Sequence, residues 1–236
     1  MGEEFDAFMD LFSDLPREGP GSVDSLMRVL DMAKTPTDAR IFDAACGSGA
    51  DSAILSRALP DAEIFAVDKQ PQFIEAAKAR GIRADFKTED MLKPDGKFDL
   101  IWCAGAVYFC GVEKALEVWR THLKPGGKIA FSELVWLTSD PSIEAKEYWA
   151  DAYPEMTGIN QMIARIEANG FQVISADPLG RASWEAFYRS LKDRSVALQG
   201  RGPIMDAVIA ENEAEIATFE RFFGEYDYAV FLVQPK

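Results

Sequence analysis

Short apolar runs alternate with amphipathic stretches over the first 135 residues of this chain. Runs of strand length occur at Arg40 to Ala44, Glu63 to Val67, Phe98 to Cys103 and Lys128 to Val135, with a more polar one near Arg83 to Lys87. Between them, apolar residues recur at helical spacing over Ala50 to Leu59, Gln70 to Arg80 and Gly111 to Leu123. This alternation predicts an α/β fold in which helices cover both faces of a mostly parallel sheet.

The pattern changes on either side of this region. Two predicted helices, Glu3 to Phe12 and Val23 to Ala33, precede the first strand, and we interpret residues 1–38 as an N-terminal helical cap. Residues 137–158 are rich in aromatic and acidic side chains, so we expect an insertion over the top of the sheet. The remaining pattern predicts a helix, a strand, two helices and a last strand at Ile159 to Asn169, Phe171 to Ala176, Trp184 to Leu198, Met205 to Phe223 and Tyr228 to Val233.

Composition limits the functions that this chain can have. Its 236 residues are 48% hydrophobic, which is enough for the single domain that we expect. The net charge of −14 disfavours nucleic acid as a partner, because phosphates would be repelled. No apolar run approaches the roughly 18 residues of a membrane span, and the acidic segment from Met1 to Leu15 does not resemble a secretory signal.

Cysteine and histidine usage bears on metals and on the cellular compartment. The three cysteines lack the spacing of metal ligands, and the chain has one histidine, so we expect no metal site. Free thiols without a signal sequence favour a reducing, cytoplasmic location.

The most informative stretch runs from Ile41 to Gly49. It predicts a buried strand that ends in a glycine-containing turn, followed by a helix. Glycines in such a turn let a ligand approach the backbone closely, and the helix N-terminus beyond it offers free N–H groups. A second strand ends in Asp68, 19 positions after Gly49, close to the spacing at which a carboxylate meets ribose hydroxyls. The pair predicts a nucleotide-type site.

Four features in one order identify a family. They are Asp43-x-Ala45-x-Gly47-x-Gly49, Asp68 after the second strand, Asp90 after the third, and Lys124-Pro125-Gly126-Gly127 before the fifth. Together they resemble the class I S-adenosylmethionine-dependent methyltransferases. Three further motifs are similar to a bacterial subgroup of small-molecule methyltransferases of types 11 and 25, namely Arg17-x-Gly19-Pro20-Gly21-Ser22, Ile101-Trp102-x-x-Gly105-Ala106-x-Tyr108 and Trp149-x-Asp151-Ala152-Tyr153-Pro154-Glu155.

The resemblance implies a Rossmann-like, doubly wound, seven-stranded sheet whose last strand is antiparallel and forms a hairpin with strand six. S-adenosylmethionine would lie across the carboxyl ends of strands one, two and four. One position departs from the family, which usually has glycine where Ala45 stands; alanine permits the approach if its φ stays negative.

The resemblance also implies roles for individual residues around the cofactor. Asp68 would accept both ribose hydroxyls, Asp90 and Met91 would hold the adenine, and Asp43 would contact the amino acid end. Arg17, with the turn that contains Gly21, would hold the cofactor's carboxylate. The other expected cofactor neighbours are the rim residues Lys69 and Phe73, the turn residues Ala45, Gly47 and Gly49, and Cys103, Ala104 and Gly105 facing the sulfonium.

The expected reaction is in-line transfer of a methyl group to a nucleophilic atom of a small molecule. Glu133 and Tyr108 are the candidate bases. Aromatic walls exclude water and can hold a cation, and the candidate substrate-binding residues are Trp136, Trp149, Tyr153, Glu155, Trp184 and Tyr188.

Two other functional classes stay open at this stage. One is an NAD(P)-dependent oxidoreductase, although its three-glycine fingerprint is incomplete here. The other is a non-catalytic protein that binds S-adenosylmethionine. A protein or RNA substrate is disfavoured, because no Asn/Asp-Pro-Pro-Tyr tetrapeptide follows the fourth strand and no basic patch is present. Exposed phenylalanines near the N-terminus could serve a homodimer.

Overall fold

A single mixed sheet forms the centre of the computed structural model, which describes residues 2–12 and 14–236. Its seven long strands are β1 (Arg40–Ala44), β2 (Glu63–Asp68), β3 (Asp85–Thr88), β4 (Phe98–Cys103), β5 (Leu123–Trp136), β7 (Phe171–Pro178) and β8 (Tyr226–Pro235). They lie in the order β3-β2-β1-β4-β5-β8-β7, and the two-residue strand β6 (Thr157–Gly158) pairs with β5 outside this path.

The strand directions confirm the predicted architecture. Strands β3, β2, β1, β4 and β5 are parallel to their neighbours. Strand β8 is antiparallel to both β5 and β7, so that it fills the space between them. The Rossmann-like sheet with an antiparallel last strand is therefore present.

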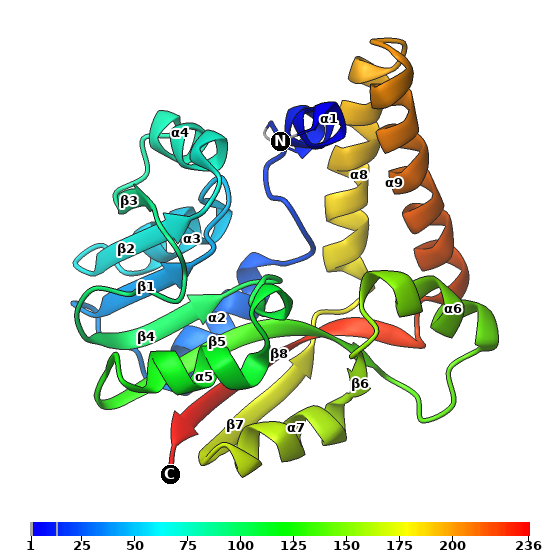
Figure 1. The fold of residues 1–236 in the computed structure, drawn as a ribbon. Coiled ribbons are helices and arrows are strands. Elements are labelled where there is room, and N and C mark those ends of the chain that lie inside the picture. Colours follow the sequence, from blue (N-terminus) through cyan, green and yellow to red (C-terminus); the bar gives the residue numbers. More distant parts are fainter. Residues whose placement is uncertain (1, 13) are drawn as a thin grey trace.

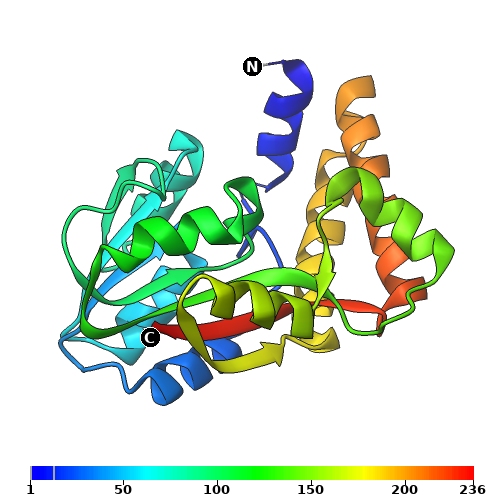
Figure 2. The same ribbon diagram turned by 60° about the horizontal axis from the view of Figure 1, so that its bottom comes forward.

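Helices cover both faces of the parallel part (Figures 1 and 2). Helices α2 (Val23–Ala33), α3 (Ala50–Ala58) and α4 (Pro71–Ala79) lie on one face, and α5 (Val112–Arg120) and α7 (Ile159–Ala168) on the other. Apolar residues repeat at a helical period in these segments, so each helix buries one side against the strands. Trp119 on α5 is fully buried in this way, and its indole N–H donates to the Met91 carbonyl at 2.9 Å.

A second group of helices rises from the β8 end of the sheet. Helices α8 (Arg181–Leu198) and α9 (Pro203–Phe222) form a long pair, with α1 (Glu3–Phe12) beside them at the top of Figure 1 and α6 (Ile143–Ala152) near their base. A separate apolar cluster joins them, and its members include Leu11 on α1, Trp184 on α8, Phe219 on α9 and Tyr226 on β8. This layer stands above the carboxyl ends of β4 and β5.

The helices of the predicted N-terminal cap pack in two different places. Helix α2 begins with a capping box between Ser22 and Ser25 and packs with α3 beneath the sheet. Helix α1 instead packs on α8 and α9, where Arg194 binds Asp10 and Asp14. The idea that 1–38 acts as one cap, like the single-domain assignment, stays a prediction.

Several elements differ from the sequence-based expectation. Helix α5 ends at Arg120, whereas we predicted Leu123, and β5 already begins at Leu123 with an irregular register through Lys124-Pro125-Gly126-Gly127. Residues 137–158 contain the helix α6, which was not predicted; Ser142 caps it by accepting from the Ala145 N–H at 3.3 Å. None of the helices in the described ranges 2–12 and 14–236 combines the length and apolar character required to cross a membrane.

Candidate active site

The strand order reverses between β1 and β4, which are neighbours in the sheet. In open α/β sheets, a crevice forms beyond the carboxyl ends of the strands at such a reversal, because the helices that follow the two strands go to opposite faces. Helix α3 follows β1 on one face, whereas α5 follows β4 on the other. Most of the predicted cofactor residues lie at this edge.

The turn after β1 uses three residues with left-handed backbone. Gly47 has φ 53°, Gly49 has φ 83°, and Ala45 has φ 58°. We expected φ of Ala45 to be negative, and this expectation is wrong. Its methyl group is accommodated at a conformation that costs an L-residue about 1 kcal/mol or more. A glycine in the family pattern would avoid this cost.

The two glycines of this turn have different roles. A Cβ on Gly47 would lie 2.2 Å from Glu18 Oε2, so this glycine lets another group approach the turn. A Cβ on Gly49 would lie 3.0 to 3.2 Å from side-chain atoms of Ile82, Ala77 and Phe86. The absent side chain of Gly49 therefore faces α4 and β3. Its role is close packing of the protein, which corrects our interpretation that it permits ligand approach.

Asp68 lies at the glycine turn, as the sequence spacing predicted. Its Oδ2 accepts from the Gly47 N–H at 2.9 Å, and its Oδ1 accepts from the Gln70 N–H at 2.8 Å. Burial raises the pKa of the carboxyl, while these backbone hydrogen bonds favour its charged form. Each oxygen still has a second lone pair, so the carboxylate can accept two further hydrogen bonds.

Asp43 is buried at the end of β1. Its Oδ2 accepts from the Ser52 hydroxyl at 2.5 Å. Burial, followed by the nearby charge of Asp51, raises the pKa of Asp43 to about 7. Asp43 thus supports the first turn of α3 and carries a carboxyl that titrates near neutrality.

The loop between α1 and α2 crosses the start of α3. Arg17 forms an ion pair with Asp51, whose other oxygen accepts from the Trp102 indole N–H at 3.0 Å. A Cβ on Gly21 would lie 1.9 Å from the Arg17 guanidinium, so Gly21 provides the space that Arg17 fills. Arg17, Gly21, Asp51 and Ala104 line one small cavity. The structure therefore brings the predicted carboxylate-binding residues next to the end of β4.

Glu18 in the same loop was not among the predicted site residues. Its Oε2 lies over Gly47, and its Oε1 is buried without a hydrogen-bond partner among the described residues. Burial raises the pKa of Glu18, and the adjacent Ser48 favours the charged form. Arg80 on the segment after α4 fixes the loop by donating to the carbonyls of Leu15 and Pro16. A lone glutamate in a loop gives no signal in the sequence that could have identified it.

Of the residues predicted near the adenine and the rim of the site, Asp90 and Lys69 form an ion pair, whereas Met91 and Phe73 are buried. Asp90 accepts from the Leu92 N–H at 2.9 Å and pairs with Lys69 at 3.1 Å, which lowers the pKa of Asp90. Met91 is buried below them. Phe73 is buried in the apolar cluster that contains residues of α1 and α8, so it is a core residue and not the predicted rim residue.

The three predicted neighbours of the sulfonium, at the end of β4, differ in their exposure. Cys103 is fully buried in the core beneath α5, so its side chain does not face the edge, contrary to expectation. Ala104 and Gly105 are partly exposed. The Gly105 N–H donates to Ser132 Oγ at 2.8 Å, and a Cβ there would lie 3.8 Å from the Tyr228 ring.

Glu133 on β5 is the strongest candidate base. It is fully buried, its Oε1 accepts from the Leu134 N–H at 3.0 Å, and its Oε2 has no hydrogen-bond partner within the described ranges. Burial raises the pKa of Glu133 to about 7. Tyr108 is 41% exposed, and burial of its hydroxyl raises its pKa to about 12. A phenol with that pKa stays protonated at neutral pH, which disfavours Tyr108 as the base.

Two predicted substrate residues are core residues. Trp184 is 1% exposed, stacks on Phe219 and Tyr228 at 5.4 Å each, and donates its indole N–H to Asp227 at 2.6 Å. Tyr188 is 3% exposed and donates to Glu215 at 2.8 Å. Their predicted substrate contact is therefore wrong for Trp184, whose two ring faces are covered, and is limited for Tyr188 to its hydroxyl end.

The remaining predicted substrate residues stay near the upper edge of β5. Trp136, Trp149 and Tyr153 are partly exposed, and Glu155 is exposed. Trp149 meets Tyr226 with ring centroids 5.1 Å apart, and Tyr153 lies 6.1 Å from Tyr108.

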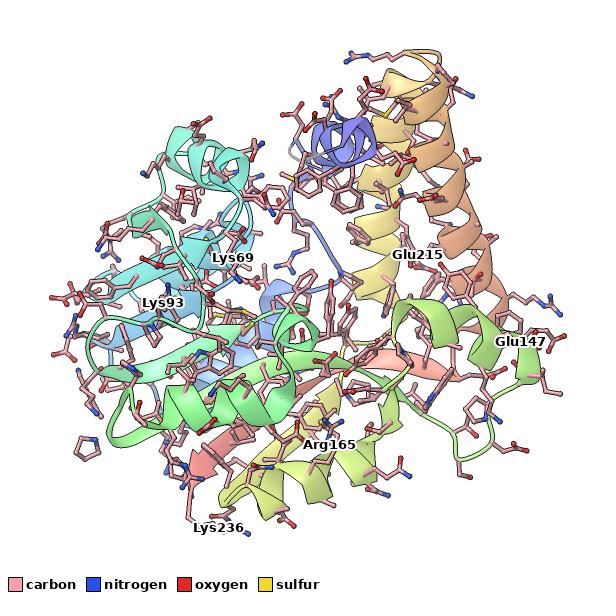
Figure 3. All side chains as sticks on the ribbon, viewed as in Figure 1. Lys69, Lys93, Glu147, Arg165, Glu215 and Lys236 are labelled. Carbon is pink, nitrogen blue, oxygen red and sulfur yellow. The ribbon has the colours of Figure 1, made fainter. Side chains whose placement is uncertain are left out.

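Glu215 on α9 was also missed by the sequence analysis. In Figure 3 it lies on the α8–α9 side of the molecule, whereas Lys69 lies on the opposite, β2–α4 side. Burial raises the pKa of Glu215. No group of three or more His, Cys, Asp or Glu side chains suited to a metal ion occurs within residues 2–12 and 14–236.

Part of this chain is similar in sequence to known methyltransferases. Residues 41–127 match the family model described as a methyltransferase domain. A malonyl-(acyl-carrier protein) O-methyltransferase of Herminiimonas arsenicoxydans is 34% identical over 96 residues, which is 40% of this chain and 36% of the relative. A demethylmenaquinone methyltransferase of Thermus thermophilus is 36% identical over 115 residues, covering 45% of this chain and 52% of the relative. This chain thus spans about a third to a half of the length of these relatives.

Among solved structures, similarity extends over nearly the whole chain. A methyltransferase from Geobacter sulfurreducens, crystallised with S-adenosyl-L-homocysteine, matches with a TM-score of 0.86 at 20% identity and covers 98% of both chains. At this identity the match establishes the fold.

Proposed function

We propose that this chain, a member of the class I S-adenosylmethionine-dependent methyltransferases, transfers a methyl group from S-adenosylmethionine to a small-molecule acceptor. The observation that carries the proposal is the pairing of Asp68 with the Gly47 turn, because it joins a ribose-type acceptor to a close-approach turn at the edge where the sheet order reverses.

The residues at this edge fit the cofactor. Asp68 has free lone pairs for ribose hydroxyls, and the Gly47 turn leaves room that a Cβ would fill. The unpartnered Glu18 Oε1 would accept hydrogen bonds from the cofactor's ammonium group, and Arg17 would bind its carboxylate. Bound there, the cofactor supplies a methyl group on a sulfonium centre that is already a good leaving group.

The protein's own contribution is orientation and proton transfer. Ala104 and Gly105 are small and leave space beside the transferred methyl group, while Ser132 fixes the Gly105 backbone. Glu133 would take the proton that the acceptor atom loses, and its pKa of about 7 suits a base at neutral pH.

The oxidoreductase alternative has no observation in its favour, because the third glycine of its fingerprint is absent and the matched family is that of methyltransferases. A small-molecule acceptor and a cytoplasmic location belong to the proposal. The three cysteines are free, which suits a reducing compartment. A homodimer through α1 stays a prediction, since Phe12 is buried within this chain whereas Phe8 is 41% exposed.

Calorimetric titration with S-adenosylhomocysteine tests the proposal. The wild-type protein should bind it, and Asp68→Ala should weaken binding about 100-fold, because a buried carboxylate that accepts two ribose hydroxyls is lost. Asp85→Ala is the matched control; Asp85 is exposed at the amino end of the neighbouring strand β3. NAD and NADP should produce no heat. Unchanged affinity for S-adenosylhomocysteine in Asp68→Ala would show that Asp68 does not bind the ribose. Binding of NAD without binding of S-adenosylhomocysteine would favour the oxidoreductase over the methyltransferase.

A further inference from the structure

All six tyrosines of the chain gather at the upper end of β4, β5 and β8. Tyr226 and Tyr228 lie at the start of β8, which pairs with the end of β5, and Tyr108 follows β4. The other three come from α6, the residue after it, and α8, namely Tyr148, Tyr153 and Tyr188.

Tryptophans connect most of these rings into one aromatic group. Trp149 has ring centroids 5.1 Å from both Tyr148 and Tyr226. Trp184 lies 5.4 to 5.9 Å from Tyr188, Tyr226 and Tyr228. Aromatic ring faces carry partial negative charge, so such a group attracts cations.

Two carboxyl groups border the same region, Glu133, which is fully buried, and Glu215, which is partly exposed. Burial raises the pKa of Tyr108, Tyr153 and Tyr228, and the charge of Glu133 raises it further. Besides burial, the charge of Glu215 raises the pKa of every tyrosine except Tyr153. Glu215 is placed by its contact with the Tyr188 hydroxyl, whereas Glu133 points from the face of β5 opposite to Tyr228, so the two carboxylates border the aromatic group from different sides.

Among the residues that the structure describes, neither carboxylate has a cationic partner that neutralises it. Glu215 accepts from the Tyr188 hydroxyl, which is neutral. Glu133 Oε2 has no hydrogen-bond partner within the described residues, and the nearby Tyr153 hydroxyl, which lowers the pKa of Glu133, is also neutral. The charge of Arg165 on α7 lowers the pKa of Glu133, but the guanidinium of Arg165 already donates two hydrogen bonds, of 2.7 and 2.9 Å, to Glu113. An unpartnered acceptor at zero exposure has a desolvation cost that a bound donor would remove.

The region is also accessible and close to the proposed methyl donor. Tyr108 is 41% exposed and Tyr228 is partly exposed. The Tyr228 ring approaches Gly105, which follows β4 at the edge assigned to the cofactor. A ligand that contacts both tyrosines would thus lie beside the transferred methyl group.

We propose that the methyl acceptor is a small amine, bound as its ammonium ion between the tyrosine rings and the carboxylates of Glu133 and Glu215. This inference rests on the proposed function. Before transfer, the ammonium gives one proton to Glu133, and the freed nitrogen lone pair forms the new N–C bond. The S–C bond breaks, its electron pair stays on sulfur, and the neutral thioether leaves beside a methylated ammonium product.

The same features disfavour a carboxylate acceptor. A substrate carboxylate would meet two acidic side chains of the protein in a poorly solvated region, and their ionised forms would repel it unless a cation accompanied it. The choice between a cationic and an anionic acceptor therefore follows from the sign of the charge at this site.

Ligand-detected NMR on the protein saturated with S-adenosylhomocysteine tests the inference with three probes of one carbon skeleton: n-butylamine, n-butanol and butyrate. Butylammonium should bind about tenfold more tightly than butanol, through cation–π contacts and the carboxylates, and butyrate should not bind. Glu215→Gln should weaken the amine about tenfold relative to wild type. Glu211→Gln removes the same charge from the exposed side of α9 and should leave its affinity unchanged.

Each other outcome has a distinct meaning. Failure of S-adenosylhomocysteine to bind would overturn the proposed function itself. Binding of S-adenosylhomocysteine together with equal affinity for the three probes would overturn only the amine assignment. Displacement of the amine by S-adenosylhomocysteine would also overturn it, because the amine would then occupy the cofactor's place. Tyr228→Phe, which keeps the ring and removes the hydroxyl, should retain amine binding if the ring face is the cation's partner.

Discussion

Glu133 combines full burial, an unpartnered oxygen and a pKa raised to about 7. A base must be deprotonated to act, so kcat of the wild-type enzyme should rise with pH and level off above about 7. Replacement Glu133→Gln keeps the shape and removes the base. We expect kcat to fall by about 10² to 10⁴-fold, with the dissociation constant for S-adenosylhomocysteine unchanged.

Steady-state rates across pH, together with calorimetric titration, check this prediction. Glu117→Gln on the exposed side of α5 is a control that should change neither quantity. A Glu133→Gln enzyme with the wild-type kcat would eliminate Glu133 as the base. Loss of cofactor affinity in parallel with kcat would instead assign it to the cofactor site.

Residue types alone could identify Asp43, Asp68 and the glycine turn, because these residues lie within one short stretch of sequence and their spacing along it is that of a nucleotide-type site. They could not identify Glu18 or Glu215, which approach the site from a loop and from α9 and lie next to it only once the chain has folded. Nor could residue types predict the left-handed backbone conformation of Ala45, since its φ angle depends on the whole turn. Trp184 shows the reverse error, because an aromatic residue suited to a ligand is equally suited to a core.

At the level of elements, hydrophobic periodicity predicted nearly every helix and strand. Strand β4 and helices α1 and α2 have the predicted bounds. The exceptions have physical causes. Helix α6 shows weak amphipathic character, and it is held by the Ser142 cap and by the packing of Trp149 on Tyr226. The Lys124-Pro125-Gly126-Gly127 segment reads as a turn, yet it belongs to β5 as an irregularity in the pairing with β4.

Gly127 in that irregularity should tolerate no side chain. A Cβ there would lie 2.7 Å from the Phe98 carbonyl oxygen and 3.0 Å from that of Lys124, both backbone atoms that cannot move aside independently. We expect Gly127→Ala to lower the free energy of unfolding by about 2 to 3 kcal/mol, measured by urea denaturation.

The neighbouring glycine provides a matched comparison. Gly126 has φ 80° and open space around the Cβ position, so Gly126→Ala carries backbone strain of about 1 kcal/mol without a clash. The prediction is wrong if Gly126→Ala proves the more destabilising of the two.

For the molecule as a whole, buried acids predict how stability depends on pH. Burial raises the pKa values of Asp43 and Glu133 to about 7 in the folded protein, above the ordinary values of 3.8 and 4.5 that apply to the unfolded chain. Between these values the folded state holds protons that the unfolded state has lost. Stability is therefore greatest below about pH 4 as far as these two groups are concerned, and it falls as pH rises through about 7.

Urea denaturation at about pH 5.5 and about pH 8 measures this effect. The unfolding free energy should be lower at the higher pH, with each group contributing at most about 3 kcal/mol. In Glu133→Gln the decrease should be smaller, because one of the titrating groups is gone. A free energy that increases over this range, or an unchanged slope in the variant, would contradict the assignment.

The gathering of tyrosines above the sheet also determines what the optical spectra of this protein report. All six tyrosines and three of the five tryptophans, Trp136, Trp149 and Trp184, belong to the region beside the proposed acceptor site. Near-ultraviolet circular dichroism arises from aromatic side chains in fixed surroundings, which is why its loss marks loosened tertiary packing. In this molecule that band will respond chiefly to occupancy of one end of the sheet, so a changed near-ultraviolet spectrum on ligand addition is no sign that the remainder of the core has rearranged.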